Sequence, residues 1–171
     1  MTKQISSNIF LFILLLLMQV LVADNIRLFG FGSPLIYVLF IIALPVNSPR
    51  WLLLILGFAM GLCVDMFHNT PGMHSTATLF MAFIRPFVLG NASPREDFEY
   101  GVRPSIQTMK FASFFSYASI LIVIHHVSLF LIEAFSWNDF LNSFLRTLVR
   151  IIFTLFLVLL SQYLFVKKQE R

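Results

Sequence analysis

The charged residues of this chain lie almost entirely between long runs of apolar residues. Runs such as 111–132 and 151–166 approach or exceed the roughly 20 residues that a helix needs to cross a bilayer. Hydrophobic residues make up 58% of the 171 residues, and charged residues only 12%. A soluble domain of this size could not bury so much apolar surface, so we expect lipid to surround most of the protein.

Continuous apolar runs predict membrane-spanning helices, because barrel strands alternate apolar and polar residues and irregular backbone is not stable against hydrocarbon. The sequence therefore predicts an all-α polytopic membrane protein, with one integral membrane domain over residues 1–171. Prolines and a Pro-Gly turn separate about six short transmembrane helices in one bundle. The six apolar segments are 6–23, 34–45, 51–66, 73–90, 111–134 and 148–166.

The second and third segments are short for a bilayer. A helix over 34–45 reaches roughly 18 Å, against a hydrocarbon core of about 30 Å. The two segments either cross a thinned bilayer or dip into it as a hairpin. A hairpin would leave Arg50 near the middle of the membrane, which is costly, so two short crossings are favoured.

The distribution of Lys and Arg indicates the orientation. With the N-terminus inside, most of the basic residues face the cytoplasm, and both termini are cytoplasmic. The cytoplasmic set is Lys3, Arg50, Arg95, Arg103, Lys110, Lys167, Lys168 and Arg171, with Arg85 nearby. The opposite side carries Arg27, Arg146 and Arg150 among mostly acidic charges: Asp24, Asp65, Glu133 and Asp139. The cytoplasmic loop 90–110 is either a solvated connector or a docking site for a partner.

Asp65, His68 and His74 surround the predicted turn after the third segment. Asp65 and His68 share one helix face, but no metal-binding motif is present, so structural roles are favoured over a metal site. Asp65 either meets water, accepts hydrogen bonds from the following turn, or pairs with a cation such as Arg146 or Arg150. The sequence shows no nucleophile elbow, phosphate loop or paired carboxylates. We therefore expect no enzyme activity, cofactor, metal or nucleic-acid partner.

Other polar residues lie inside the apolar segments. His125 and His126 are in the fifth segment and point about 100° apart, so at least one should face the bundle. Packing is favoured over a proton relay, because the sequence shows no chain of ionisable residues at matching depth. Arg146 and Arg150 are interpreted as interfacial anchors rather than a partner or headgroup site. Arg85, before Pro86, is expected to anchor the inner end of the fourth segment.

The stretch before the last segment is amphipathic. Ser136 and Asp139 fit a capping box, and apolar residues recur at helical spacing from Trp137 to Leu148. This pattern predicts an amphipathic stretch that lies at the outer interface before the last span, 148–166.

Three stretches resemble the rod-shape-determining protein MreD family. They are the glycine-rich helix end GFAMGLCVD at 57–65, the turn TPGMH at 70–74 and the apolar run 79–86 that ends in Arg-Pro. Chain length, segment count and the short second span after Gly-Ser-Pro at 32–34 are also similar. The tight turn and the long charged loop resemble the version found in the Bacteroidetes group of bacteria. The positions that match the motif are Gly57, Gly61, Asp65, Pro71 and Gly72.

The resemblance implies a non-catalytic membrane subunit of the bacterial cell-elongation complex, in the inner membrane, that helps control cell shape and lateral peptidoglycan synthesis. Implied partners are an MreC-like bitopic protein, an MreB-like filament, and the wall glycan polymerase and transpeptidase. The family is similar in fold to the S-components of energy-coupling-factor transporters. The alternative function is therefore an S-component-like module that binds a small solute. Gly57 and Gly61, spaced as G-x-x-x-G, predict a close contact with another helix.

Overall fold

The computed structural model describes residues 2–26, 33–92, 101–133 and 140–165. These residues form helices and connecting turns, without any strand. Four stretches are long and apolar enough to cross a membrane: Gln4–Asn25, Arg50–His68, Phe111–Glu133 and Phe140–Leu164. The expectation of an all-helical fold is confirmed for the described residues, and these four apolar stretches suggest a membrane protein.

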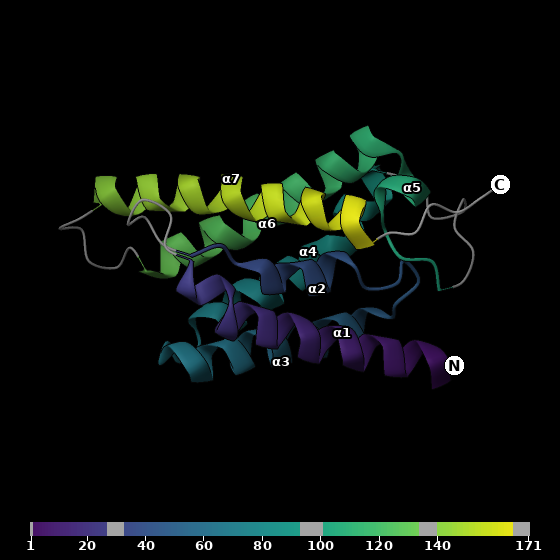
Figure 1. Cartoon of the computed structure of the whole chain (residues 1–171), viewed down its shortest axis with the longest axis horizontal. Coiled ribbons are helices and arrows are strands. Elements are labelled where there is room, and N and C mark those ends of the chain that lie inside the picture. Colours follow the sequence, from purple (N-terminus) through teal and green to yellow (C-terminus); the bar gives the residue numbers. More distant parts are fainter. Residues whose placement is uncertain (1, 27–32, 93–100, 134–139, 166–171) are drawn as a thin grey trace.

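Five long helices run along the length of the bundle (Figure 1). They are α1 (Thr2–Leu21), α3 (Arg50–His68), α4 (Met73–Ala92), α6 (Phe111–Glu133) and α7 (Phe140–Phe165). Helix α4 packs against both α3 and α6, and α7 packs along α6. Helix α1 begins and α7 ends at the same end of the bundle, where the short helix α5 (Ile106–Met109) also lies.

Helix α4 corresponds to the predicted fourth segment, yet it is less apolar than the four candidate spans. Its first turns carry His74, Ser75 and Thr78, and Arg85 lies in its second half. All four of these polar side chains are buried. The face of α4 that packs against α3 and α6 can carry polar groups that lipid would not accept, which explains the lower hydropathy of this helix.

The predicted helix over 34–45 is wrong in detail. This segment forms a short 3₁₀ helix, η2 (Ile36–Val38), followed by one turn of α-helix, α2 (Leu39–Ile42). Together these two pieces rise only roughly 12 Å. The segment lies between the long helices, and the side chains of Tyr37, Val38, Phe40, Ile41 and Ile42 have no exposed surface.

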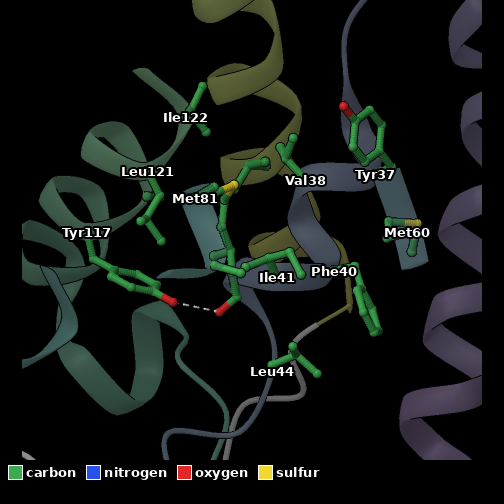
Figure 2. Packing of buried hydrophobic residues seen from close by; sticks show 14 of the residues in the cluster. Tyr37, Val38, Phe40, Ile41, Leu44, Met60, Met81, Tyr117, Leu121 and Ile122 are labelled. Atoms are coloured by element: carbon green, nitrogen blue, oxygen red, sulfur yellow. Dashed lines mark hydrogen bonds between the residues drawn. The ribbon is translucent and has the colours of Figure 1, made fainter. Parts of the chain in front are cut away.

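The buried segment supplies the middle of the hydrophobic core. Figure 2 shows its side chains among residues of α3, α4 and α6, with the rings of Tyr37 and Tyr117 on opposite sides of the view. The labelled neighbours from the long helices are Met60, Met81, Tyr117, Leu121 and Ile122. Side chains of the long helices pack against this segment, so the segment occupies the centre of the bundle.

The predicted start of the last span at residue 148 is also wrong. Residues Phe140–Phe165 form one continuous helix, which includes most of the stretch predicted to lie at the interface before the span. Phe140, Leu141, Phe144 and Leu145 are exposed on its first two turns. The capping box at Ser136 and Asp139 lies outside the described residues.

The second half of the predicted cytoplasmic loop packs on the bundle. Ser105 and Thr108 form a capping box at the start of α5. Arg103 donates to the carbonyl oxygen of Ala43 at 3.0 Å and also contacts Asn8 of α1. Burial lowers the pKa of the Arg103 guanidinium. Residues 101–110 are therefore part of the folded domain, whereas 93–100 lie outside the described residues.

Candidate functional site

Asp65 joins the end of α3 to the start of α4. Its Oδ1 accepts from the backbone N–H of His74 at 2.9 Å and from Thr70 Oγ1 at 3.0 Å. Its Oδ2 accepts from the backbone N–H of Ser75 at 2.9 Å and of Gly72 at 3.2 Å. The first N–H groups of a helix have no intrahelical partner, and a carboxylate there also meets the positive end of the helix dipole. Asp65 thus caps α4 from the preceding helix.

The turn between the two helices requires particular backbone conformations. Asn69 ends α3 at a φ of 55°, and Gly72 has a φ of 90°. Residues with a side chain rarely adopt the conformation of Gly72. Pro71 and Gly72 therefore shape the turn that brings the α4 backbone to Asp65.

Gly57 and Gly61 lie against α4, the kind of close contact that their spacing predicts. A Cβ atom on Gly57 would lie 2.8 Å from the Ala82 Cβ. A Cβ on Gly61 would lie 2.6 Å from the His74 carbonyl oxygen and closer still to Ser75 Cα. The backbones of α3 and α4 can approach this closely only because both residues lack a side chain. The five motif positions therefore belong to one α3–α4 junction.

Replacing Gly61 with alanine should lower the free energy of unfolding by about 1–3 kcal/mol, the range for forcing an extra methyl group into a packed interior. The matched control is Gly90→Ala in α4, where an added Cβ meets nothing within 4 Å. That control should be neutral or stabilising by up to about 1 kcal/mol, because alanine favours a helix over glycine. Denaturant unfolding in detergent micelles, read by reaction of Cys63 with a thiol reagent, compares the two. Equal stability of both variants would show that Gly61 makes no close contact.

A chain of hydrogen bonds starts beside this junction and runs into the bundle. Asp24 Oδ2 is 2.7 Å from His68 Nε2, and His68 Nδ1 is 3.3 Å from His74 Nε2. His74 Nδ1 is 2.9 Å from the hydroxyl of Tyr37, which is 2.9 Å from His125 Nε2. We call Asp24, His68, His74, Tyr37 and His125 the histidine chain. Its members come from five different elements: the short 3₁₀ helix η1 (Ala23–Asn25), α3, α4, η2 and α6.

The histidine chain runs from a partly exposed end to a fully buried one. The side chains of His68 and Asp24 are 24% and 21% exposed, whereas Tyr37 and His125 have no exposed surface. The expectation that no ionisable residues line up with His125 is wrong. Asp24, Tyr37 and the two other histidines are far from His125 in sequence, and the fold brings them together. The lone tyrosine in the apolar segment 34–45 was the available signal, because a buried phenol needs a partner.

His126 belongs to a second, shorter set of contacts. Its Nδ1 is 2.8 Å from the carbonyl oxygen of Ile122, and its Nε2 is 3.4 Å from Thr154 Oγ1. Thr154 also accepts from the backbone N–H of Leu35 at 3.0 Å. Both adjacent histidines therefore face the bundle, and they bind different partners.

Side chains of other elements satisfy the free backbone groups of the buried segment. At its start, Gln19 donates to the Pro34 carbonyl oxygen at 3.1 Å and accepts from the Tyr37 N–H at 3.3 Å. At its end, Tyr117 Oη donates to the Ile42 carbonyl oxygen at 3.0 Å. Arg85 donates to the carbonyl oxygens of Leu44 and Pro45. Irregular backbone at membrane depth is stable where protein provides its hydrogen bonds in this way.

The prediction that Arg85 anchors the end of the fourth segment is wrong. Arg85 is completely buried, and its Nε donates to Tyr117 Oη at 2.9 Å. The guanidinium therefore links α4, α6 and the end of the buried segment. Its positive charge also lies where the carbonyl dipoles of α2 end, which is favourable.

Arg146 and Arg150 lie inside α7 rather than at its start. Arg146 is exposed, and Arg150 pairs with Glu133 of α6 at 3.8 Å. The four hydrogen bonds that Asp65 accepts come from the following turn and from α4. Of the three alternatives for Asp65, the one in which it accepts hydrogen bonds from the turn is therefore correct.

Within the ranges that the structure describes, no three His, Cys, Asp or Glu side chains are placed to hold a metal ion. The polar groups at the α3–α4 end can instead hold the junction rigid and share protons along hydrogen bonds. No protein-family model, no curated protein and no solved structure matches this chain.

Proposed function

We propose that this protein is a non-catalytic membrane subunit of the bacterial cell-elongation complex. In this proposal it helps control cell shape and lateral peptidoglycan synthesis through contacts with an MreC-like bitopic protein, an MreB-like filament, and the glycan polymerase and transpeptidase. The proposal rests on the resemblance to the MreD family. The observation that supports it best is the α3–α4 junction, where all five matching residues, Gly57, Gly61, Asp65, Pro71 and Gly72, serve one local structure.

The packed centre of the bundle supports an interaction protein over a solute carrier. The segment 36–42 packs between the long helices, and five of its seven side chains have no exposed surface: Tyr37, Val38, Phe40, Ile41 and Ile42. A protein that acts through contacts needs a rigid shape, and its outer surface is left for lipid and partners. Large apolar side chains are exposed on α1 and α3, among them Phe10, Ile55, Phe58 and Phe67.

The proposed topology has six passes through the inner membrane, with both termini cytoplasmic. The segment 33–46 and α4 supply the two passes beyond the four apolar candidates. The segment is buried among the long helices, whereas α4 buries its polar face and exposes Phe80, Phe83 and Phe87. The same end of the bundle holds the start of α1, the end of α7 and α5 with Arg103. This end would face the cytoplasm, and Asp24 and the α3–α4 turn would lie at the outer face.

The alternative is a solute-binding module similar to the S-components of energy-coupling-factor transporters. One observation favours it: His125 Nδ1 is buried and has no hydrogen-bond partner among the described residues. A buried ring nitrogen of this kind could bind a donor group of a small solute. This alternative requires that the purified protein retains such a molecule.

Co-purification from native membranes in mild detergent tests the proposal. The tagged chain should retain the MreC-like and wall-synthesis partners, identified by mass spectrometry, and Gly61→Leu should reduce their recovery more than Ala59→Leu does. In a Cys63→Ser background, a cysteine at Asn138 but not at Ser93 should react with an impermeant reagent in spheroplasts. A retained small molecule together with an energising transport subunit, and no wall-synthesis partner, would replace this proposal with the alternative.

A further inference from the structure

The partners along the histidine chain fix the position of each proton. The Asp24 carboxylate only accepts, so His68 carries its proton on Nε2 and, when neutral, accepts on Nδ1. His74 must then donate from Nε2 and accept on Nδ1. Tyr37 therefore donates to His74 and accepts from His125 Nε2. Every donor in the chain points toward Asp24.

The contacts of Thr78 independently indicate that His125 carries its proton on Nε2. Its hydroxyl donates to the His74 carbonyl oxygen at 2.7 Å, so Oγ1 can only accept from His125 Nε2, which is 3.4 Å away. His125 is thus an Nε2–H tautomer by two separate arguments. Its other nitrogen, Nδ1, is a buried acceptor without a partner in the described part of the chain. His126 is the opposite tautomer, because its Nδ1 faces a carbonyl oxygen.

We infer that the histidine chain is a proton-binding relay that connects the buried His125 Nδ1 to the Asp24–His68 pair at the α3–α4 end of the bundle. A proton that binds His125 Nδ1 displaces the Nε2 proton to Tyr37. The Tyr37 hydroxyl proton passes to His74 Nδ1, and the His74 Nε2 proton passes to His68 Nδ1. One proton has been added, and His68 is an imidazolium that still donates from Nε2 to the Asp24 carboxylate. The donors between His68 Nδ1 and His125 Nε2 now all point toward His125.

In both arrangements of the relay, before and after a proton is added, each hydrogen bond has one donor and one acceptor. An intermediate in which only some of the donors have changed direction would place two donors against each other. If His68 alone gained a proton, its Nδ1–H and the Nε2–H of His74 would face each other at 3.3 Å, donor against donor. If the His74 proton moves to Nδ1, this donor faces the hydroxyl proton of Tyr37 instead. If the Tyr37 hydroxyl then points to His125, it faces the Nε2–H of His125. The conflict disappears only when the His125 proton is on Nδ1. Charge on His68 and the tautomer of His125 should therefore change together.

Other charges near the relay are already paired. Asp65 accepts four hydrogen bonds from the turn and α4, and Arg150 of α7 pairs with Glu133 of α6. Gln19 donates to Asp24 Oδ1 at 2.7 Å and holds that carboxylate in place. His126 faces Ile122 and Thr154 and does not join the relay. Among the described charged groups, the Asp24 carboxylate is therefore the counter-ion of the protonated His68.

Nitrogen-15 NMR of the ¹⁵N-histidine-labelled full chain in lipid nanodiscs tests this inference, with single His→Gln variants for assignment. At a pH where all four rings are neutral, His68, His74 and His125 should carry Nε2 protons, and His126 an Nδ1 proton. On acidification, His125 should change to the Nδ1–H form in the same step in which His68 becomes doubly protonated. A His125 that keeps its Nε2 proton through that step overturns the relay, as does a different tautomer pattern at the start.

Tyr37→Phe removes the middle of the relay. In this variant His68 should still become charged, but the change at His125 should disappear. Tyr117→Phe removes another completely buried hydroxyl, at the opposite end of the core, and should leave the joint change intact. Joint switching that survives in Tyr37→Phe would contradict the inference. If Tyr37→Phe does not fold, the wild-type titration still decides, because it measures both residues in one sample.

Discussion

Replacing Asp65 with leucine should lower the free energy of unfolding by about 4 kcal/mol, because it leaves the buried N–H groups of His74 and Ser75 without acceptors. Gly72 and Thr70 lose their acceptor as well. Asp65→Asn should cost about half as much, since its amide keeps one accepting oxygen while the NH₂ group faces backbone donors. The measurement is denaturant unfolding in micelles, read by Cys63 reactivity, together with the protein level in membranes.

A second acidic residue provides the control for Asp65. Glu133 is partly exposed and makes one ion pair, with Arg150 at 3.8 Å. Glu133→Leu should change stability by less than about 1 kcal/mol, as for other exposed pairs. If Asp65→Leu and Glu133→Leu unfold at the same denaturant concentration, Asp65 is a solvated turn residue and its cap carries no stability. Complementation of a shape-defective deletion strain, with protein level measured in parallel, separates loss of the fold from loss of function.

Arg85→Met should destabilise the protein by about 2–4 kcal/mol, since two buried carbonyl oxygens, of Leu44 and Pro45, lose their donor. Methionine retains much of the volume, so the effect reports the hydrogen bonds more than the packing. Arg85→Lys should be intermediate, because an ammonium keeps the charge but not the planar set of donors that reaches Tyr117 and both carbonyls at once. Thermal unfolding in micelles, followed by circular dichroism, ranks the stability of the wild type, Arg85→Lys and Arg85→Met.

Arg50 is the matched control for Arg85. It begins α3, is exposed, and lies 5.6 Å from the centre of the Phe87 ring. Removing such an exposed cation–π contact should cost no more than about 1 kcal/mol. A result in which Arg50→Met and Arg85→Met are equally stable would mean that water, rather than Arg85, satisfies the end of the buried segment.

Sequence patterns were sufficient to predict a helix where apolar residues continue without a break along its whole length. The predicted segments 51–66 and 111–134 agree closely with α3 (Arg50–His68) and α6 (Phe111–Glu133), because unbroken apolar runs of that length have few alternatives in a membrane. The last helix shows the limit. An interfacial helix and a spanning helix share the same 3.6-residue period, so the pattern could not distinguish two helices from the continuous Phe140–Phe165.

The two parts of the candidate site, the α3–α4 junction and the histidine chain, also differ in how far the sequence could predict them. The contact of Gly61 with α4 and the cap by Asp65 join residues of two consecutive helices. The spacing of the glycines therefore predicted a close helix contact, and hydrogen bonds from the following turn were one of three alternatives for Asp65. The histidine chain joins residues that are far apart in sequence, as His125 and Tyr37 are separated by 88 positions. A single sequence contains no signal for such a pairing, beyond the requirement that each buried polar group must find a partner.

The manner in which the segment 33–46 is held has a consequence for biosynthesis. The segment is too short to enter a bilayer as a stable helix by itself, and its free backbone groups depend on residues made much later. The N–H of Leu35 donates to Thr154, which is 119 positions further along the chain. The carbonyl oxygen of Ile42 accepts from Tyr117, which is 75 positions further along. Contacts over such separations close late, because the intervening chain must first be ordered. We therefore expect the early helices to pack fully only after α7 has been made, because α7 supplies Thr154.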